Sequence, residues 1–270
     1  MRYEKRILAF VDILAFSEEI KSTIDKNTGE EIELKTEKIN QLFEKVLAIN
    51  KKKYFQDNVK SKKLSHFSDS VAISYLLGEE AGILHVLFDI MYFCISAFQD
   101  GFLIRGAITY GDLHHSDNKL YGPAMLTAYD MEKKLAFYPR VVFEKKIMDI
   151  VNENLVKWPS KFDQLVILKK IIEKDFDGLY YLNYFNSIDF IFGATEGFLV
   201  FFKLFREKII EMQKKIENDN SIKSKYLWLR EKYYIALKNS TRKYLKPKIK
   251  LEFPKLYNFL KDEADIMDYF

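Results

Sequence analysis

The sequence has almost no cysteine, since Cys94 is the only one among 270 residues. A disulfide bond within the chain is therefore impossible, and the composition fits a reducing compartment such as the cytoplasm. Cys94 lies in an apolar run that we expect to form a buried helix, where a thiol fills space. No obvious catalytic triad accompanies it, so nothing in the sequence points to a side-chain nucleophile.

The sequence also lacks a charge excess and long uncharged apolar runs. Its net charge of +4 comes from 43 basic and 39 acidic residues, a balance that does not indicate nucleic-acid binding. No uncharged apolar stretch reaches the roughly 18 residues of a membrane-spanning helix, and the first residues, MRYEKR, do not resemble a signal peptide. With 48% apolar and 30% charged residues, the chain is expected to be globular with a substantial core.

Hydrophobic periodicity predicts an α+β domain followed by helices. We expect a domain over residues 1–184 and a helical appendage over 185–270, which packs on that domain or on a dimer partner. Strands are predicted over 6–12, 64–67, 70–77, 102–110 and 140–143, with two more around a type I′ turn at Asp177–Gly178. Helices are predicted over 16–23, 34–50, 79–99, 124–135 and 144–154 in the first domain. Residues 111–119 read as a polar turn that carries His114 and His115, which we expect at the surface, with a metal site as the alternative.

Two aspartates interrupt apolar runs of strand length, Asp12 in ILAFVDILAFS and Asp69 in HFSDSVAISY. A carboxylate at the end of a buried strand costs several kcal/mol if it is unpaired. Each aspartate taken alone also fits a helix cap or a turn residue. Two of them on neighbouring strands favour a site where they share divalent metal ions for phosphoryl or nucleotidyl transfer.

Four motifs follow one another along the chain in a recognisable order. They are FVDILAFS at Phe10–Ser17, FSDS at Phe67–Ser70, RGAITYG at Arg105–Gly111 and YGPA at Tyr121–Ala124. This order resembles the class III nucleotidyl cyclase catalytic domain and, more narrowly, the bacterial pyrimidine cyclases of Pycsar anti-phage defence. The resemblance covers roughly residues 6–184, and the hairpin DGLYYLNY near its end strengthens the narrower match. It implies a ferredoxin-like βαββαβ core that works as a head-to-tail homodimer, with active sites at the dimer interface.

The resemblance also implies roles for individual residues. Asp12 and Asp69 would bind two Mn²⁺ or Mg²⁺ ions per site, with the backbone carbonyl of Ile13 as a further ligand. Arg105 would grip the triphosphate, a role that suits its planar charged donors; its alternative is an interface or surface salt bridge. The backbone amides that would cradle phosphate at a helix start belong to Leu14, Ala15, Phe16 and Ser17, with Ala15 in place of the usual glycine.

Other positions depart from the purine cyclases. The two base-reading positions fall on Ser65 and Lys119, which favours a pyrimidine, with uracil ahead of cytosine because it offers a second carbonyl. For Lys119 a solvated hairpin lysine is the alternative. The transition-state Asn and Arg of purine cyclases are replaced by Leu126 and Asp130. Polar candidates near them are Thr127, Tyr129 and Glu132.

Three functions remain open at this level. The first is an enzyme that converts UTP or CTP to the 3′,5′-cyclic monophosphate and pyrophosphate, a second messenger for a separate effector in anti-phage defence. The second is a degenerate cyclase-homology domain that binds a nucleotide or a partner. The third, a palm-type polymerase or oligonucleotide synthase, is disfavoured because the near-neutral charge provides no basic strand for a template.

Overall fold

The computed structural model describes residues 2–51, 60–79, 82–154, 167–168, 170–185, 196–214 and 220–267. The chain divides into two units, Met1–Leu182 and Asn183–Phe270, and each is described by itself. In the first unit the elements are β1 (Glu4–Ile13), α1 (Phe16–Ser22), α2 (Glu33–Lys51), β2 (Lys63–Phe67), β3 (Ser70–Leu76), α3 (Gly82–Gln99), β4 (Ile104–Ser116), β5 (Lys119–Tyr121), α4 (Pro123–Leu135), β6 (Val141–Phe143), α5 (Lys145–Asn154), β7 (Ile172–Lys174) and β8 (Tyr180–Leu182).

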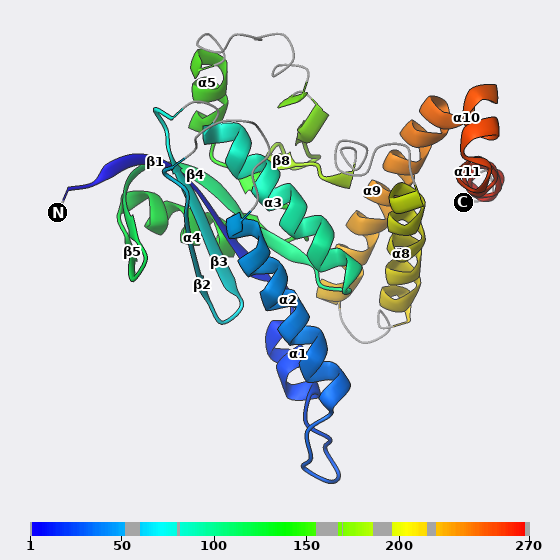
Figure 1. The fold of residues 1–270 in the computed structure, drawn as a ribbon, viewed down its shortest axis with the longest axis horizontal. Helices are drawn as coiled ribbons and strands as arrows, with labels where there is room; N and C mark the ends of the chain where they lie inside the picture. The colour runs from blue at the N-terminus through cyan, green and yellow to red at the C-terminus, as the bar shows by residue number, and fades with distance from the viewer. Residues whose placement is uncertain are drawn as a thin grey trace. The chain divides into compact units, whose positions relative to one another are not determined.

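These strands form one open mixed sheet with the order β2-β3-β1-β4-β6-β8-β7, and β5 pairs with β4 outside this path (Figure 1). Every neighbouring pair is antiparallel except β4 and β6, which run parallel. Strands and helices are thus mixed in one layered unit. The expected α+β class is confirmed at this level.

Strand β1 lies between β3 and β4 and has helices over both of its faces. On one face Ile7, Ala9 and Val11 are fully buried on the side of α3, where the β3 residue Tyr75 stacks on His85 of α3. The opposite face, which we call the α4 face, has a core of Leu8, Phe10, Ala72, Leu113, Ala124 and Ala128. Because both faces are covered, β1 is an almost continuous apolar run rather than an alternating one.

Helix α3 is long and apolar enough to cross a bilayer, but 83% of it is buried inside the protein. Its one acidic residue, Asp89, is fully buried. The Lys62 ammonium lies 2.8 Å from the Asp89 carboxylate, and the Tyr75 hydroxyl donates a hydrogen bond of 2.6 Å to it. These partners satisfy a charge that would be costly in a protein core without them.

Two glycines of the recognised motifs are required by their surroundings. A Cβ on Gly106 would lie 2.7 Å from the Val11 Cα and would collide with the carbonyl oxygen of Phe10 on the neighbouring strand. Gly122 precedes α4 with φ of +142°, and its Cβ would lie 2.7 Å from the carbonyl oxygen of Asp112. Glycine therefore permits the close contact of β1 with β4 and the turn that starts α4.

Two local predictions were wrong in detail. The polar turn expected over 111–119 is mostly strand, because β4 continues to Ser116 and pairs with β5 as a hairpin. The turn between β7 and β8 is not type I′, which requires positive φ at both central residues. Only Gly178 has positive φ there, and the Asp175 carbonyl accepts a hydrogen bond from the Gly178 amide. This is a type I turn followed by a glycine in the left-handed region.

The described part of the second unit is helical. It contains α8 (Glu196–Gln213), α9 (Asn220–Tyr244), α10 (Pro247–Glu252) and α11 (Pro254–Met267). Its core is aromatic: Phe202 and Phe205 of α8 pack on Tyr233 of α9. The Tyr233 hydroxyl donates a hydrogen bond of 2.9 Å to Glu263 of α11, which also pairs with Arg206. Aromatic packing and this buried polar contact join three of the helices.

The close contact between β1 and β4 predicts a cost for Gly106→Ala. The added methyl group collides with backbone, which cannot move aside as a side chain can, so the free energy of unfolding should fall by about 1–3 kcal/mol. Urea denaturation monitored by circular dichroism measures this change. Gly78→Ala is the matched control, because a Cβ at that position meets nothing within 4 Å. Equal stabilities for the two variants would contradict the packing argument.

Candidate active site

Asp12 lies at the end of β1, directly between two residues of the neighbouring strands. It pairs with Ser70 of β3 on one side and with Arg105 of β4 on the other. Because directly paired residues of an antiparallel sheet point to the same face, Asp12 and Arg105 both lie on the α4 face. The turn between β2 and β3 is tied to the same place, since the Ile13 amide donates a hydrogen bond of 3.0 Å to the carbonyl oxygen of Asp69. The three predicted residues Asp12, Asp69 and Arg105 are therefore brought together.

Glu132 of α4 joins this group. Its Oε1 lies 2.7 Å from Nη2 of Arg105, and the same nitrogen donates to Oδ2 of Asp12 at 3.4 Å. Glu132 is 3% exposed, whereas the two residues that follow it, Lys133 and Lys134, are exposed. The spacing of four residues from Ala124 to Ala128 and on to Glu132 places all three on the buried side of α4. Sequence reasoning named Glu132 only as one of three polar candidates, although this spacing was a signal for it.

The electrostatics of the group are dominated by crowded carboxylates. Burial, followed by the charges of Asp69 and Glu132, raises the pKa of Asp12 to about 6, and Arg105 offsets only part of this rise. Burial also raises the pKa of Glu132, again against the effect of Arg105. One guanidinium thus faces more negative charge than it neutralises. Such a site gains stability when cations bind next to the carboxylates.

The residues after Asp12 form the turn that starts α1. The Leu14 amide donates to the carbonyl oxygen of Leu103 at 2.8 Å. Contrary to the expectation, this amide is therefore not available to a phosphate. Ala15 adopts φ of +60°, in the left-handed region that glycine adopts without strain. Phe16 is buried and contacts Phe43 of α2 edge to face at 6.0 Å between ring centres. Of the four expected phosphate-binding amides, those of Ala15, Phe16 and Ser17 have no backbone acceptor among the described residues.

The two predicted base-reading residues lie apart from the carboxylates and are not joined by a hydrogen bond within the described ranges. Ser65 is on β2, where its hydroxyl oxygen lies 2.9 Å from Nε2 of His115. Lys119 is exposed at the start of β5. The prediction that His115 lies at the surface is wrong, because its side chain is only 5% exposed. It was missed because β4 was expected to end before it.

The other candidates on α4 face solvent. Leu126 is 71% exposed, and Asp130 pairs with Lys134 of its own helix at 3.1 Å. The Thr127 hydroxyl donates to the carbonyl oxygen of Pro123 one turn earlier. Tyr129 is exposed beside Lys133. Within this unit none of these side chains reaches the carboxylates, so they act in the site only if a second molecule brings them there.

The donor set suits Mg²⁺ or Mn²⁺ that is shared with phosphate groups. No group of three or more His, Cys, Asp or Glu side chains in the described ranges has the arrangement of a complete metal site. Mg²⁺ in phosphate-binding sites is commonly held by one or two carboxylates, with phosphate oxygens and water as the other ligands. Asp12, Asp69 and the Ile13 carbonyl fit that pattern, and the raised pKa of Asp12 is the strain such ions would relieve. No protein-family model matches the chain, and a search of curated proteins returns no match.

The raised pKa of Asp12 predicts that this residue destabilises the fold above pH 6. The folded state keeps the Asp12 proton to about pH 6, whereas the unfolded chain releases it near pH 3.9. Stability therefore falls as the pH rises between these values, and the penalty persists above them. Asp12→Asn should raise the free energy of unfolding by about 1–3 kcal/mol at pH 7.5, with the gain vanishing below about pH 4. The measurement is urea denaturation at several pH values.

Asp112→Asn serves as the control for this experiment. Asp112 is a half-exposed carboxylate on β4 whose partner is Lys5 at 2.9 Å, and surface pairs of this kind contribute about 1 kcal/mol or less. Its replacement should lower stability slightly or leave it unchanged at every pH. A loss of stability at pH 7.5 in Asp12→Asn would show that the Asp12 charge is well accommodated.

Glu132 should act on the same titration. Glu132→Gln removes one of the negative charges that raise the pKa of Asp12 and leaves Arg105 to pair with Asp12 alone. The titration midpoint of Asp12, followed by its carboxyl ¹³C resonance, should move from about 6 towards its ordinary value. An unchanged midpoint would mean that the Glu132 charge does not reach Asp12.

Proposed function

We propose that this protein is a nucleotidyl cyclase that converts UTP or CTP to the 3′,5′-cyclic monophosphate and pyrophosphate. The observation that carries the proposal is the pairing of Asp12 with Arg105 across β1 and β4, next to the Asp69 turn. Two carboxylates, which are the ligands that divalent cations take, thus lie beside a guanidinium, which suits phosphate. A triphosphate with its divalent ions requires both kinds of group within one small site.

The topology of the first unit supports the proposal. Its first elements follow the βαββαβ order: β1, then α1 and α2, the hairpin of β2 and β3, α3 and β4. Their strands lie side by side as β4-β1-β3-β2, with antiparallel neighbours. A ferredoxin-like cyclase core has this order. The positive φ of Ala15, where the resemblance expects glycine, adds a second, local point of support.

In the proposed reaction the chain's own residues mainly bind and orient the substrate. Asp12, Asp69 and the Ile13 carbonyl would hold the two divalent ions, which lower the pKa of the ribose 3′-hydroxyl and neutralise developing charge. Arg105 would turn from its carboxylate partners towards the triphosphate. Its buried Nε has no hydrogen-bond acceptor among the described residues, so the present contacts do not saturate it. The 3′-oxygen then attacks the α-phosphorus in line, and pyrophosphate leaves.

Exposed apolar side chains support the proposed head-to-tail homodimer. Phe67 next to the Asp69 turn is 84% exposed, Leu126 on α4 is 71% exposed and Tyr121 at the end of β5 is 42% exposed. Contact with a second chain would remove this surface from water. It would also bring the solvent-facing residues of α4 to the partner's site. In this proposal the cyclic product acts as a second messenger in anti-phage defence and is bound by a separate effector.

The side chains of Leu126 and Asp130 favour one alternative function. These two positions correspond to the Asn and Arg that stabilise the transition state in purine cyclases, and neither side chain present can donate to a phosphate oxygen. A domain that binds a nucleoside triphosphate without converting it would need the Asp12 and Arg105 pair but not those donors. The alternative function is therefore a nucleotide-binding module.

A direct assay separates the two functions. The full chain is incubated with UTP, CTP, ATP or GTP and Mn²⁺, and the products are identified by mass spectrometry. Cyclisation predicts a cyclic pyrimidine nucleotide and pyrophosphate in equal amounts. Asp12→Ala should abolish this product because the ions lose a ligand, whereas Asp112→Ala on the next strand should retain it.

A second measurement detects binding without turnover. Mn²⁺ with UTP should raise the melting temperature of the wild type but not of Asp12→Ala, since ligands that bind only the folded state stabilise it. Stabilisation without any cyclic product would establish the binding module instead of the enzyme. A cyclic purine as the main product would contradict the pyrimidine assignment, and turnover by Asp12→Ala would contradict the metal role.

A further inference from the structure

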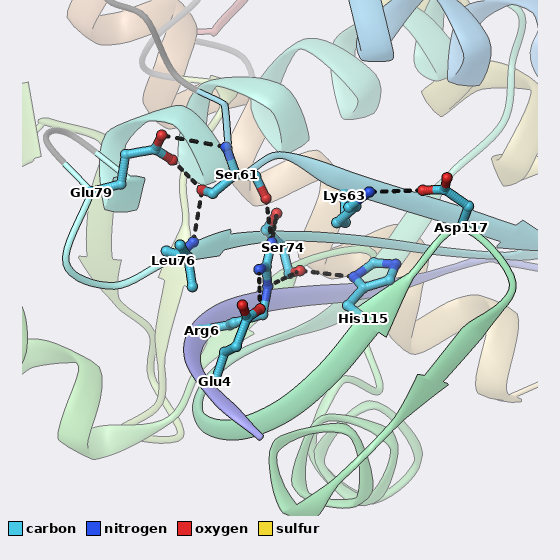
Figure 2. A network of polar contacts seen from close by, with 9 residues as sticks. All are labelled: Glu4, Arg6, Ser61, Lys63, Ser74, Leu76, Glu79, His115 and Asp117. Carbon is cyan, nitrogen blue, oxygen red and sulfur yellow. Dashed lines mark hydrogen bonds and ion pairs between the residues drawn. The ribbon is translucent and has the colours of Figure 1, made fainter. Parts of the chain in front are cut away.

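A line of hydrogen-bonded polar side chains joins four strands of the sheet and ends at Ser65; Figure 2 shows its members Arg6, Ser74 and His115. Arg6 of β1 is 3% exposed, and its Nε donates to the Ser74 hydroxyl of β3 at 2.9 Å. The Ser74 hydroxyl lies 2.8 Å from Nδ1 of His115, and Nε2 of the same ring lies 2.9 Å from the Ser65 hydroxyl. Four strands therefore contribute to one hydrogen-bonded line that begins at a guanidinium and ends at Ser65.

The direction of each hydrogen bond follows from the first donor. A guanidinium can only donate, so the Ser74 oxygen accepts from Arg6. Ser74 is fully buried, and within the described ranges its hydroxyl has no acceptor other than Nδ1 of His115. An unpaired buried hydroxyl proton would cost about 1–3 kcal/mol, so Ser74 donates to Nδ1. That nitrogen carries no proton, and the proton of the neutral ring is on Nε2, which donates to Ser65.

The surroundings of His115 keep its ring neutral. Burial and the positive charges of Arg6 and Lys63 lower the pKa of His115 to about 4, with a smaller effect of His114 in the same direction. Asp117 at the tip of the hairpin opposes this shift, but it is paired with Lys63 at 2.8 Å. At neutral pH the ring is therefore a fixed relay with one acceptor and one donor.

We propose that His115 is a positioning residue that makes Ser65 an outward hydrogen-bond donor to the substrate base. Because the Ser65 oxygen accepts from His115, its own proton points away from the buried chain, and a hydroxyl that accepts a hydrogen bond is a better donor. The ligand atom that gains most from Ser65 is a carbonyl oxygen. Uracil carries a carbonyl at the ring position where cytosine carries an amino group, so the Ser65 hydroxyl, donating to this position, selects UTP over CTP. This inference rests on the proposed function and on the expectation, from the resemblance to nucleotidyl cyclases, that Ser65 reads the base.

Nucleotide preference provides the first test. The wild type should use UTP with a kcat/KM about tenfold or more above that for CTP, the size of one discriminating hydrogen bond. Ser65→Ala and His115→Leu should each reduce this ratio by about tenfold, through KM for UTP more than through kcat. His115→Gln can accept from Ser74 and donate to Ser65, so it should restore most of the preference. Asp117→Asn removes a surface ion pair of the same hairpin and should leave the ratio unchanged.

The ring tautomer provides a second test that needs no activity. In the full chain without nucleotide, the ¹⁵N shifts of His115 at pH 7 should show a bare Nδ1 and a protonated Nε2. The inference would be overturned by a proton on Nδ1 or by a charged ring. It would also be overturned by an unchanged UTP to CTP ratio in Ser65→Ala, or by a wild-type preference for CTP. If no nucleotide is cyclised, the ratio of UTP and CTP dissociation constants with Ca²⁺ replaces the kinetic ratio, and the same changes in the variants are expected. Absence of both turnover and binding would refute the proposed function, and the inference with it, whatever the tautomer.

Discussion

The charge of Asp12 at the end of β1 is the constraint on which the rest of the first unit depends. Helices cover both faces of this strand, and the carboxylate therefore stands where water is scarce. Asp69 and Glu132 add negative charge beside it, and Arg105, which contacts both Asp12 and Glu132, offsets part of that charge. A fold that tolerates such an imbalance sacrifices stability for a site, as functional centres commonly do. In the proposed enzyme, divalent cations would supply the missing positive charge.

The same sheet has a very different polar group farther along the α4 face. The line from Arg6 through Ser74 and His115 to Ser65 has a donor for each acceptor until its last member. The cluster of Asp12, Asp69, Glu132 and Arg105 has excess negative charge and can therefore accept cations. The polar line is rigid because its hydrogen bonds are satisfied. In the proposed enzyme the first property suits ions and phosphates that arrive and leave. The second suits recognition of a base edge, which requires a fixed donor.

The β4 and β5 hairpin is the element that connects these two groups. Strand β4 carries Arg105 near its start and His115 near its end, and the turn at Gly122 then directs α4 back over the sheet so that Glu132 reaches Arg105. Gly106 lets β4 lie close against β1 beside Arg105. One continuous segment thus supplies the guanidinium, its buried carboxylate partner and the histidine of the polar line.

The resemblance to nucleotidyl cyclases added Arg105 to Asp12 and Asp69. The sequence by itself determined the α+β class, the main strands and helices of the first unit, and the expectation that Asp12 and Asp69 share a site. These follow from local signals, namely apolar periodicity and charged residues inside apolar runs, because each signal lies within a few residues of the feature it reports. The resemblance to nucleotidyl cyclases rests on the same short motifs, and the cyclase activity stays a prediction.

Only the tertiary structure decided the roles of Glu132 and His115. The sequence named Glu132 only as one of three polar candidates on α4, and it placed His115 in a polar turn. Both are buried because of partners that lie far away in the sequence, Arg105 for Glu132 and the serines of β2 and β3 for His115. Burial and hydrogen-bond direction depend on which strands and helices lie next to one another in the fold. A local pattern of residues carries no information about these neighbours.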